Sequence, residues 1–290
     1  MRTLLAALLL AASAARAQTS TLDARDLSRG LSLPPTSTAT VEDATALSVN
    51  PAALSRAGAA QLFYAREQSA PKDQSADALF LGTTVFDAVG LGASAQWLRS
   101  PSGPDARRLA VGLSLGGPDF SVGTSWNHFR APGLPALSGM QSWDVGVQAR
   151  PLRQLSLAAG LRNLDAPARD GLRLDREWLV GAAVRPLGER LTVAVDWSQK
   201  DSVPLREGQL SWLVQGEPLR GLQLGAGFSH GLGGPVPPAA QLSVTFNLGQ
   251  LGAGYALGLG GRGPTHTAVA RASVGRWPSL VQGAPKIAVL

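Results

Sequence analysis

The sequence predicts an all-β fold, a 14-stranded antiparallel transmembrane β-barrel with an N-terminal segment that plugs its lumen. Three observations predict it: an export signal, a long series of segments in which apolar residues alternate with small or polar ones, and connections that alternate between long and short. Bacterial outer-membrane barrels have an even number of strands, short periplasmic turns and longer external loops. A soluble β-sandwich has no physical reason to follow that rule for its loops.

Residues 1–17 have the organisation of a cleavable signal peptide. Arg2 supplies a positive charge, residues 4–12 form a short apolar core, and Ala15 and Ala17 form a small-residue cleavage site before Gln18. No later stretch reaches the roughly 18 consecutive apolar residues of a transmembrane helix. The mature protein is therefore expected to be secreted, periplasmic or in an outer membrane.

Residues 18–60 precede the strands and form the expected lead-in and plug. The lead-in, residues 19–40, is polar and contains Pro34 and Pro35, so we expect it to be extended or loosely ordered. Small residues fill the following stretch, residues 41–54, which Asn50 and Pro51 interrupt. Because the residue before a proline avoids the helical region, a helix that starts at Asp43 is expected to end by about residue 49.

Residues 61–277 have the pattern of β-strands. Successive side chains of a strand point to opposite faces, so alternation predicts two environments. Leu109, Val111 and Leu113, for example, alternate with Ala110 and Gly112. Each segment has about the 9–11 residues that a tilted strand needs to cross a bilayer. We expect strands at residues 61–68, 78–86, 89–99, 108–115, 119–129, 140–150, 155–164, 176–185, 190–199, 208–216, 221–229, 239–248, 251–258 and 265–274.

The connections between these strands set the expected topology. Long connections at 69–77, 100–107, 130–139, 165–175, 200–207 and 230–238, with a medium one at 259–264, alternate with short ones at 87–88, 116–118, 151–154, 186–189, 217–220 and 249–250. If the first strand runs outward, the last returns and both termini lie in the periplasm. Alternation within the strands alone also fits a large secreted all-β sandwich or a soluble barrel with a filled interior.

The two faces of the strands suit lipid and lumen. The apolar set would meet lipid, and the set of small and polar residues would line a lumen that holds water or a plug. Asp144 and Asp196 are expected to face the lumen and to pair there with inward Arg162 or Arg185; a charged selectivity ring is the alternative. Six tryptophans near strand ends predict an interfacial girdle: Trp97, Trp126, Trp143, Trp178, Trp197 and Trp212.

Residues 43–54, DATALSVNPAAL, resemble the hatch motif of FadL-like outer-membrane proteins. Members of this superfamily commonly show Asp-Ala-Ser/Thr-Ala followed by Asn-Pro-Ala-Gly/Ala-Leu in an N-terminal plug, and then fourteen strands. They include fatty-acid transporters, aromatic-hydrocarbon channels and PorV-type components of protein secretion. The resemblance covers about residues 39–274. The positions that match the hatch motif are Asp43, Ala44, Asn50, Pro51, Ala52 and Leu54.

The resemblance implies a function and leaves alternatives. A FadL-like protein would pass small hydrophobic molecules across the outer membrane of a Gram-negative bacterium, through an apolar pocket above the hatch and a lateral gap in the barrel wall. A PorV-like protein would instead be a sealed scaffold or anchor of an envelope complex. Residues 278–290 are expected to be a periplasmic tail or the start of a further domain. The second alternative depends on KIAVL at 286–290, which is similar to the opening strand of signal peptide peptidase A-like serine peptidases.

The composition excludes several kinds of chemistry. There is no cysteine, so disulfides, thiolate metal sites and cysteine nucleophiles are excluded. None of His128, His230 and His266 has a second ligand at metal-binding spacing. The arginines are scattered, which disfavours nucleic-acid binding. We therefore expect no catalytic residue, metal or cofactor unless the chain continues beyond Leu290. The expected partners are outer-membrane lipid, a small hydrophobic ligand and envelope proteins.

Overall fold

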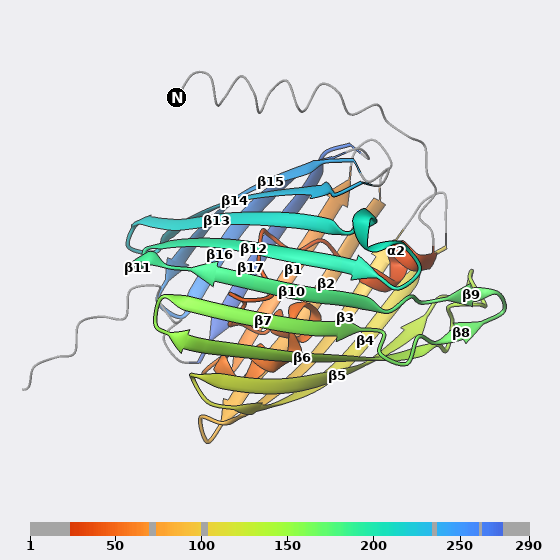
Figure 1. Ribbon diagram of the computed structural model, residues 1–290, viewed down its shortest axis with the longest axis horizontal. Helices are drawn as coiled ribbons and strands as arrows, with labels where there is room; N and C mark the ends of the chain where they lie inside the picture. The colour runs from red at the N-terminus through yellow and green to blue at the C-terminus, as the bar shows by residue number, and fades with distance from the viewer. Residues whose placement is uncertain (1–23, 70–73, 100–103, 234–236, 261–262, 275–290) are drawn as a thin grey trace, which may run out of the picture.

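Over the residues that it describes, the computed structural model is a closed barrel of fourteen antiparallel strands (Figure 1). These residues are 24–69, 74–99, 104–233, 237–260 and 263–274, so the expected signal peptide and the segment 278–290 lie outside them. Each strand pairs with its neighbours along the chain, and β17 pairs with β1 to close the barrel. The strands are β1 Gln61–Ser69, β2 Gln74–Val85, β3 Val89–Arg99, β4 Ala106–Gly116, β5 Phe120–Arg130, β6 Gln141–Leu152, β7 Leu155–Arg162, β10 Glu177–Val184, β12 Leu191–Lys200, β13 Gln209–Leu219, β14 Leu222–Gly231, β15 Ala239–Leu248, β16 Leu251–Leu259 and β17 Thr265–Ser273.

The predicted fold class is confirmed, and the strand boundaries differ from the prediction at a few ends. β2 starts at residue 74, four residues before the expected position. β6 and β13 continue past their expected ends because an irregular register, after residue 149 in one and after 216 in the other, lets pairing resume beyond it. β7 stops at Arg162 because Asn163 has a φ of 50°, which a strand cannot contain.

The two ends of the barrel differ, as the alternation of connection lengths predicted. The connection between β7 and β10 is long and holds the small hairpin of β8, Ala168–Arg169, and β9, Leu172–Arg173. It marks the long-loop end, at the right of Figure 1. The opposite, short-turn end holds the short connections, including the one with β11, Pro186–Glu189. Gln61 pairs with Ser273, so the barrel begins and ends at the short-turn end.

The outward and inward faces of the strands have the predicted character. On β4, Val111 is 52% exposed on the outside, whereas its neighbour Ala110 is 2% exposed toward the lumen. Leu157 on β7 and Val180 on β10 are likewise exposed on the outside. Serine, glutamine, asparagine and alanine side chains are buried on the inner face. The barrel thus carries an apolar exterior around a mainly small and polar lumen.

The register places the six expected girdle tryptophans on the outer face, each in the half of its strand that is nearer the long-loop end. Trp126 and Trp143 lie directly opposite each other on β5 and β6, and Trp212 lies opposite Val195. Trp143, Trp178 and Trp212 are exposed. Contact of this ring with a membrane interface stays a prediction.

Within the part of the chain that the structure describes, no helix is both long and apolar enough to cross a membrane.

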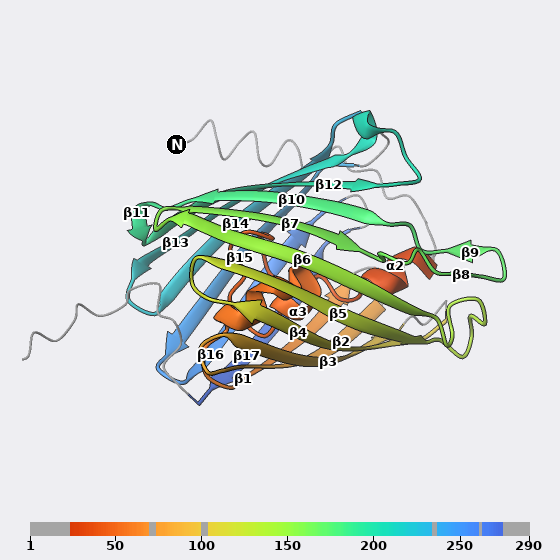
Figure 2. The same ribbon diagram turned by 60° about the horizontal axis from the view of Figure 1, so that its bottom comes forward.

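The chain before β1 lies inside the barrel, and we name residues 24–60 the lumen segment (Figure 2). It contains α2, Ala24–Arg29, α3, Ala46–Val49, and the 3-10 helix η1, Pro51–Arg56. The expected loosely ordered lead-in was therefore wrong for residues 24–29. Leu27 of this helix is 1% exposed in an apolar cluster with barrel residues, and that burial stabilises the short helix.

Candidate functional site in the barrel lumen

The centre of the lumen segment is a pair of short helices separated by Asn50. Helix α3 ends at Val49, as the Asn-Pro sequence predicted, and Asn50 is extended with φ −152° and ψ 102°. Pro51 then opens η1, where its missing N–H leaves no donor unpaired. The backbone can therefore turn from one helix into the next within a single residue.

The side chain of Asn50 connects η1, the lead-in and the barrel wall. Its Oδ1 accepts a hydrogen bond from the Ala52 N–H at 3.2 Å. Its Nδ2 donates to the carbonyl oxygens of Thr38 at 3.1 Å and of Val147 on β6 at 3.2 Å. Asn50 is 2% exposed, so each of these groups would lose its partner, without water to replace it, if the side chain were removed.

Glycines on the inner face of the barrel leave room for this backbone. A Cβ atom on Gly90 would lie 2.2 Å from the η1 backbone, and one on Gly123 would lie 2.5 Å from it. At Gly146 a Cβ atom would lie 2.0 Å from Oδ1 of Asn50. The wall from β2 to β6 therefore approaches η1 at backbone distance, which a side chain at these glycine positions would prevent.

The other positions of the hatch motif contact the lumen segment itself, β1 and β3. Asp43 Oδ1 accepts a hydrogen bond from the Thr45 N–H at 2.9 Å, and the Ala44 N–H donates to Oε1 of Gln61 at 3.1 Å. Leu54 is fully buried and packs against the inner face of β3. The structure brings all six positions together in the lumen: Asp43, Ala44, Asn50, Pro51, Ala52 and Leu54.

Further barrel side chains hold the backbone of the lumen segment. Gln148 Nε2 and Ser156 Oγ both donate to the carbonyl oxygen of Ala39, at 2.8 and 2.7 Å. Arg56, the last residue of η1, donates from Nη2 to the Gln148 carbonyl oxygen at 3.3 Å. Burial, together with the nearby charge of Arg185, lowers the pKa of Arg56 to about 10, so its guanidinium stays charged at neutral pH.

The four charged residues expected in the lumen do face it, but each of them has a different partner from the one expected. Asp144 lies 3.6 Å from Nη2 of Arg108 and accepts a hydrogen bond from Asn127 Nδ2 at 2.9 Å. Arg162 lies 3.4 Å from Oε2 of Glu177 and also donates to the Ser48 carbonyl oxygen of α3 at 3.0 Å. The strand register decides these partners, and the sequence alone does not give it. Glu177 lies on the strand next to that of Arg162, and Arg108 lies two strands away from Asp144.

Arg185 and Asp196 contact residues of the lumen segment and do not pair with each other. Arg185 Nη2 lies 3.0 Å from Oε1 of Glu42. Asp196 Oδ1 accepts hydrogen bonds from Ser37 Oγ at 3.0 Å and from the Thr38 N–H at 3.2 Å. Arg162, Arg185 and Asp196 thus attach the lumen segment to the wall. The sequence allowed either such a structural role or a charged selectivity ring.

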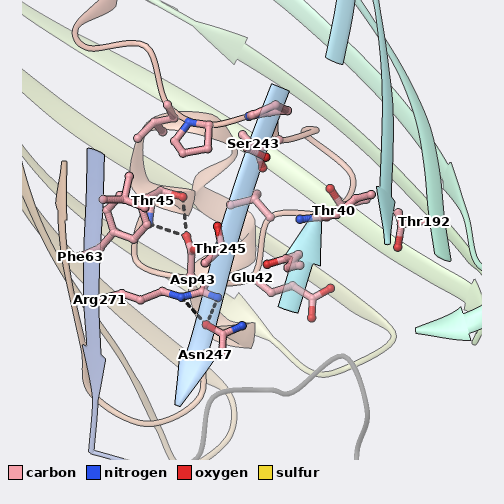
Figure 3. A pocket seen from close by; sticks show the side chains of 18 of the residues that line it. Thr40, Glu42, Asp43, Thr45, Phe63, Thr192, Ser243, Thr245, Asn247 and Arg271 are labelled. Atoms are coloured by element: carbon pink, nitrogen blue, oxygen red, sulfur yellow. Dashed lines mark hydrogen bonds between the residues drawn. The ribbon is translucent and has the colours of Figure 1, made fainter. Parts of the chain in front are cut away.

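A polar pocket of about 180 Å³ lies between the lead-in and the wall formed by β12 to β17 (Figure 3). Arg271 projects into it and donates from Nε to Oδ1 of Asn247 at 2.9 Å. Glu42 enters from the lumen segment and forms ion pairs with Arg150 and Arg185. Thr192, Ser243 and Thr245 complete a lining of hydrogen-bonding groups. Its chemistry suits water or a small polar solute.

Beside the buried charges of β4 to β10, the lumen holds an apolar cluster that extends to the long-loop end. Phe63 and Phe80 meet edge to face with their ring centroids 6.0 Å apart, and Phe129 lies in the same cluster. Leu27 and Leu31 of the lumen segment fill the centre of this cluster, with exposures of 1% and 8%. We name this part the apolar chamber; its barrel members are Phe63, Ala65, Ala76, Ala78, Phe80, Leu98, Ala106, Phe129, Ala131, Leu137, Met140, Leu174 and Val269.

Polar contacts with the barrel also hold α2 and the residues after it in place. Arg29 Nη2 lies 3.0 Å from Oε1 of Glu177, and the Arg29 carbonyl oxygen accepts a hydrogen bond from Nη1 of Arg108 at 3.2 Å. The Leu31 N–H donates to Oε1 of Gln96 at 3.1 Å. The sequence offered one signal for this arrangement, the spacing of four between Leu27 and Leu31 in a polar stretch.

The structure differs from two expectations for a channel that passes hydrophobic molecules. In place of an open apolar pocket above the hatch, the described residues form a packed apolar cluster that includes Leu27 and Leu31 of the chain itself. The expected lateral gap is not formed in the described wall, where every one of the fourteen strands pairs with both neighbours. Among the described residues, no group of three or more histidine, aspartate or glutamate side chains is arranged to hold a metal ion.

The comparisons with known proteins agree on the fold. No protein-family model matches the sequence, and no curated protein is similar to it in sequence. Among solved structures, the barrel is similar to the CymD monoaromatic hydrocarbon channel, with a TM-score of 0.58 and 11% identity over 83% of this chain and 95% of that one. It is also similar to a TodX deltaS2S3 mutant monoaromatic hydrocarbon channel, with a TM-score of 0.55 and 12% identity over 85% and 96% of the two chains. The chain therefore has the fold of an outer-membrane channel barrel.

Proposed function

We propose that this chain is a FadL-like outer-membrane barrel that gives small hydrophobic molecules a path across the outer membrane. The long loops then face the exterior and both ends of the barrel chain face the periplasm. The observation that carries the proposal is the apolar chamber. Lumens of outer-membrane barrels are ordinarily polar, so an apolar lining that Leu27 and Leu31 cover has a physical purpose if hydrophobic ligands take their place.

The energies favour a reversible exchange. Burial of one leucine side chain contributes roughly 1.5–3 kcal/mol, so the departure of both costs roughly 3–6 kcal/mol. A buried six-carbon ring gains at most about 9 kcal/mol, at the upper limit of about 1.5 kcal/mol per heavy atom. The net binding is weak, as release on the far side requires. A six-residue helix such as α2 has little stability of its own, so it can unfold when it leaves.

Uptake of a labelled monoaromatic compound tests this proposal. Cells that lack their own aromatic channels would express the full chain, and we expect them to take up ¹⁴C-toluene faster than cells with an empty vector. The chain has no cysteine, so Arg29→Cys with Glu177→Cys creates a unique pair that a cleavable bis-maleimide can link. The link holds α2 in the chamber, and we expect it to stop uptake until a reductant cleaves it.

A matched pair serves as the control for the crosslink. Arg173 and Asp201 form an ion pair of 2.9 Å outside the lumen, so the same crosslinker at cysteines in these positions leaves α2 free. Uptake should then continue. Equal uptake by the linked Arg29–Glu177 variant and this control would show that the chamber is not on the path. Uptake no faster than with the empty vector would refute transport altogether.

The second candidate is a sealed barrel that anchors an envelope complex. The contacts of the central hatch favour it, because Asn50, Gln148, Ser156 and Asp196 attach the lumen segment on several sides of the wall. Such a barrel would show no uptake and would elute from native membranes in a complex of defined mass. A monomer from native membranes with active uptake excludes it. Heat-modifiable migration of membrane fractions tests the outer-membrane location that both candidates share.

A further inference from the structure

The outer surface of the barrel carries a basic patch on five consecutive strands at the long-loop end. The register places Arg66 opposite Asp77, Asp77 opposite Trp97, and Trp97 opposite Arg107. Arg107 lies in turn opposite Arg130. These residues share the outer face with Val111 and Leu81, at even spacings along their strands. They form a row of about 19 Å across the wall, at about 4.8 Å for each strand.

One half of this row is internally paired. Asp77 lies 3.2 Å from Nη1 of Arg66 and 2.8 Å from Nη1 of Arg99, and it accepts a hydrogen bond from Tyr64 at 2.7 Å. The side chains of Arg66 and Arg99 remain 46% and 53% exposed. One carboxylate thus positions two guanidinium groups at the surface, and each keeps donors that point to solvent.

The other half places like charges next to each other. Arg107 and Arg130 are directly opposite on β4 and β5, both exposed, and such a pair is destabilising without a counter-charge. With Arg99, Trp97 and Asp105 they line a surface depression of about 290 Å³. Four arginines and the carboxylates of Asp77 and Asp105 give the patch a net charge of 4 − 2 = +2.

The patch lies at the boundary between polar rim and apolar wall. Toward the short-turn end, the next outward residues of β4 are Leu109, Val111, Leu113 and Leu115, all exposed and apolar. A ligand that spans this boundary must combine anionic groups with acyl chains. Guanidinium groups bind phosphate through paired, charge-assisted hydrogen bonds, and basic pockets beside a hydrophobic wall suit lipid head groups.

We propose that this patch binds the phosphorylated head group of a glycolipid of the lipid A class in the outer leaflet, with Arg107 and Arg130 as the phosphate ligands. The acyl chains lie along the apolar strands below. The proposal rests on the proposed membrane orientation, in which the long loops face outward. It does not depend on what the lumen passes, so a barrel that fails to transport toluene can still bind this lipid.

Native mass spectrometry of the full chain in detergent tests the proposal with three probes. These are bis-phosphorylated hexa-acyl lipid A, the same lipid without its phosphates, and inorganic phosphate. We expect the phosphorylated lipid to bind at least about tenfold more tightly than the other two, since two charge-assisted contacts exceed the roughly 1.4 kcal/mol that a tenfold ratio needs. The double variant Arg107→Gln, Arg130→Gln should lose that preference.

A control variant removes the same charge from the other end of the barrel. Arg153 and Arg220 are exposed in short turns, and their double change to glutamine should leave lipid A affinity within about twofold of the unmodified protein. Heat-modifiable migration confirms that both variants are folded. Equal affinities of the two double variants, or equal binding of the dephosphorylated lipid, would overturn the proposal. Saturation by inorganic phosphate at the same concentration would assign the patch to free anions instead.

Discussion

Substitution of Asn50 by alanine should loosen the hatch while the barrel remains intact. The change removes three hydrogen bonds, from the Ala52 N–H at 3.2 Å and to two carbonyl oxygens at 3.1 and 3.2 Å. Each is worth roughly 0.5–1.5 kcal/mol net, and loss of an N-cap asparagine alone costs roughly 0.5–2 kcal/mol. About 3 kcal/mol is therefore a reasonable sum for a side chain that is 2% exposed.

Native-state hydrogen exchange measures this loss locally. The amides of Val49, Asn50, Ala53 and Ala57 donate within α3 and η1, so their exchange reports on opening of the hatch. A loss of about 3 kcal/mol raises the exchange rate of these amides roughly 100-fold, at about 1.4 kcal/mol per factor of ten. Mass spectrometry of peptides from residues 41–57 in detergent gives the rates.

A second buried asparagine supplies the control. Asn127 is 1% exposed and hydrogen-bonds Arg108 and Asp144 on the barrel wall, without a contact to α3 or η1 among its recorded partners. Asn127→Ala should leave hatch exchange unchanged. The reasoning fails if Asn50→Ala raises hatch exchange less than about threefold. It fails as well if exchange in the barrel strands rises by the same factor, because the bonds would then hold the whole barrel and not the hatch.

Three further substitutions have expected outcomes. Gly90→Ala should raise hydrogen exchange in the hatch and lower the free energy of unfolding by roughly 1–3 kcal/mol in urea titrations, since its Cβ would meet the η1 backbone at 2.2 Å. Gly117→Ala has open space around it and should be neutral. Val111→Arg, in the middle of β4, should lower the free energy of unfolding in lipid vesicles by roughly 2–4 kcal/mol. Leu248→Arg, at a strand end, should lower it by about 1 kcal/mol or less, and equal losses would contradict a membrane-spanning wall. Arg162→Gln should raise exchange in α3 about tenfold through the lost bond of 3.0 Å, and unchanged exchange would show that this bond does not hold the helix.

The sequence predicted the barrel well because its rules are local. Alternation such as Leu109, Ala110, Val111 sets which face each strand turns to lipid, and the connection lengths set the topology. The break between α3 and η1 is equally local, since it depends on Pro51 and the residue before it. Such features require no knowledge of which strands lie across the lumen.

The contacts across the lumen could not be predicted in the same way. Asp196 accepts hydrogen bonds from Thr38 and Ser37, which lie 158 and 159 positions earlier in the chain, and Gln148 donates one to the carbonyl oxygen of Ala39, 109 positions earlier. These pairs depend on the path of the lumen segment, which its own composition does not fix. The inward glycines were predictable as small residues, but their role as the seat of η1 follows only from the register.

One connected set of charges couples the two parts of the lumen segment. Glu177 binds Arg29 of α2 at 3.0 Å and Arg162 at 3.4 Å, and Arg162 also holds the last turn of α3 through Ser48. When α2 leaves the apolar chamber, Glu177 keeps Arg162 and the nearby charge of Lys200. Arg162 contacts Glu177 through Nη1 and Ser48 through Nη2, so one guanidinium serves both at the same time. The two parts of the lumen segment are therefore attached to the same pair of wall residues, Glu177 and Arg162, and a ligand that displaces α2 leaves the bond from Arg162 to Ser48 in place.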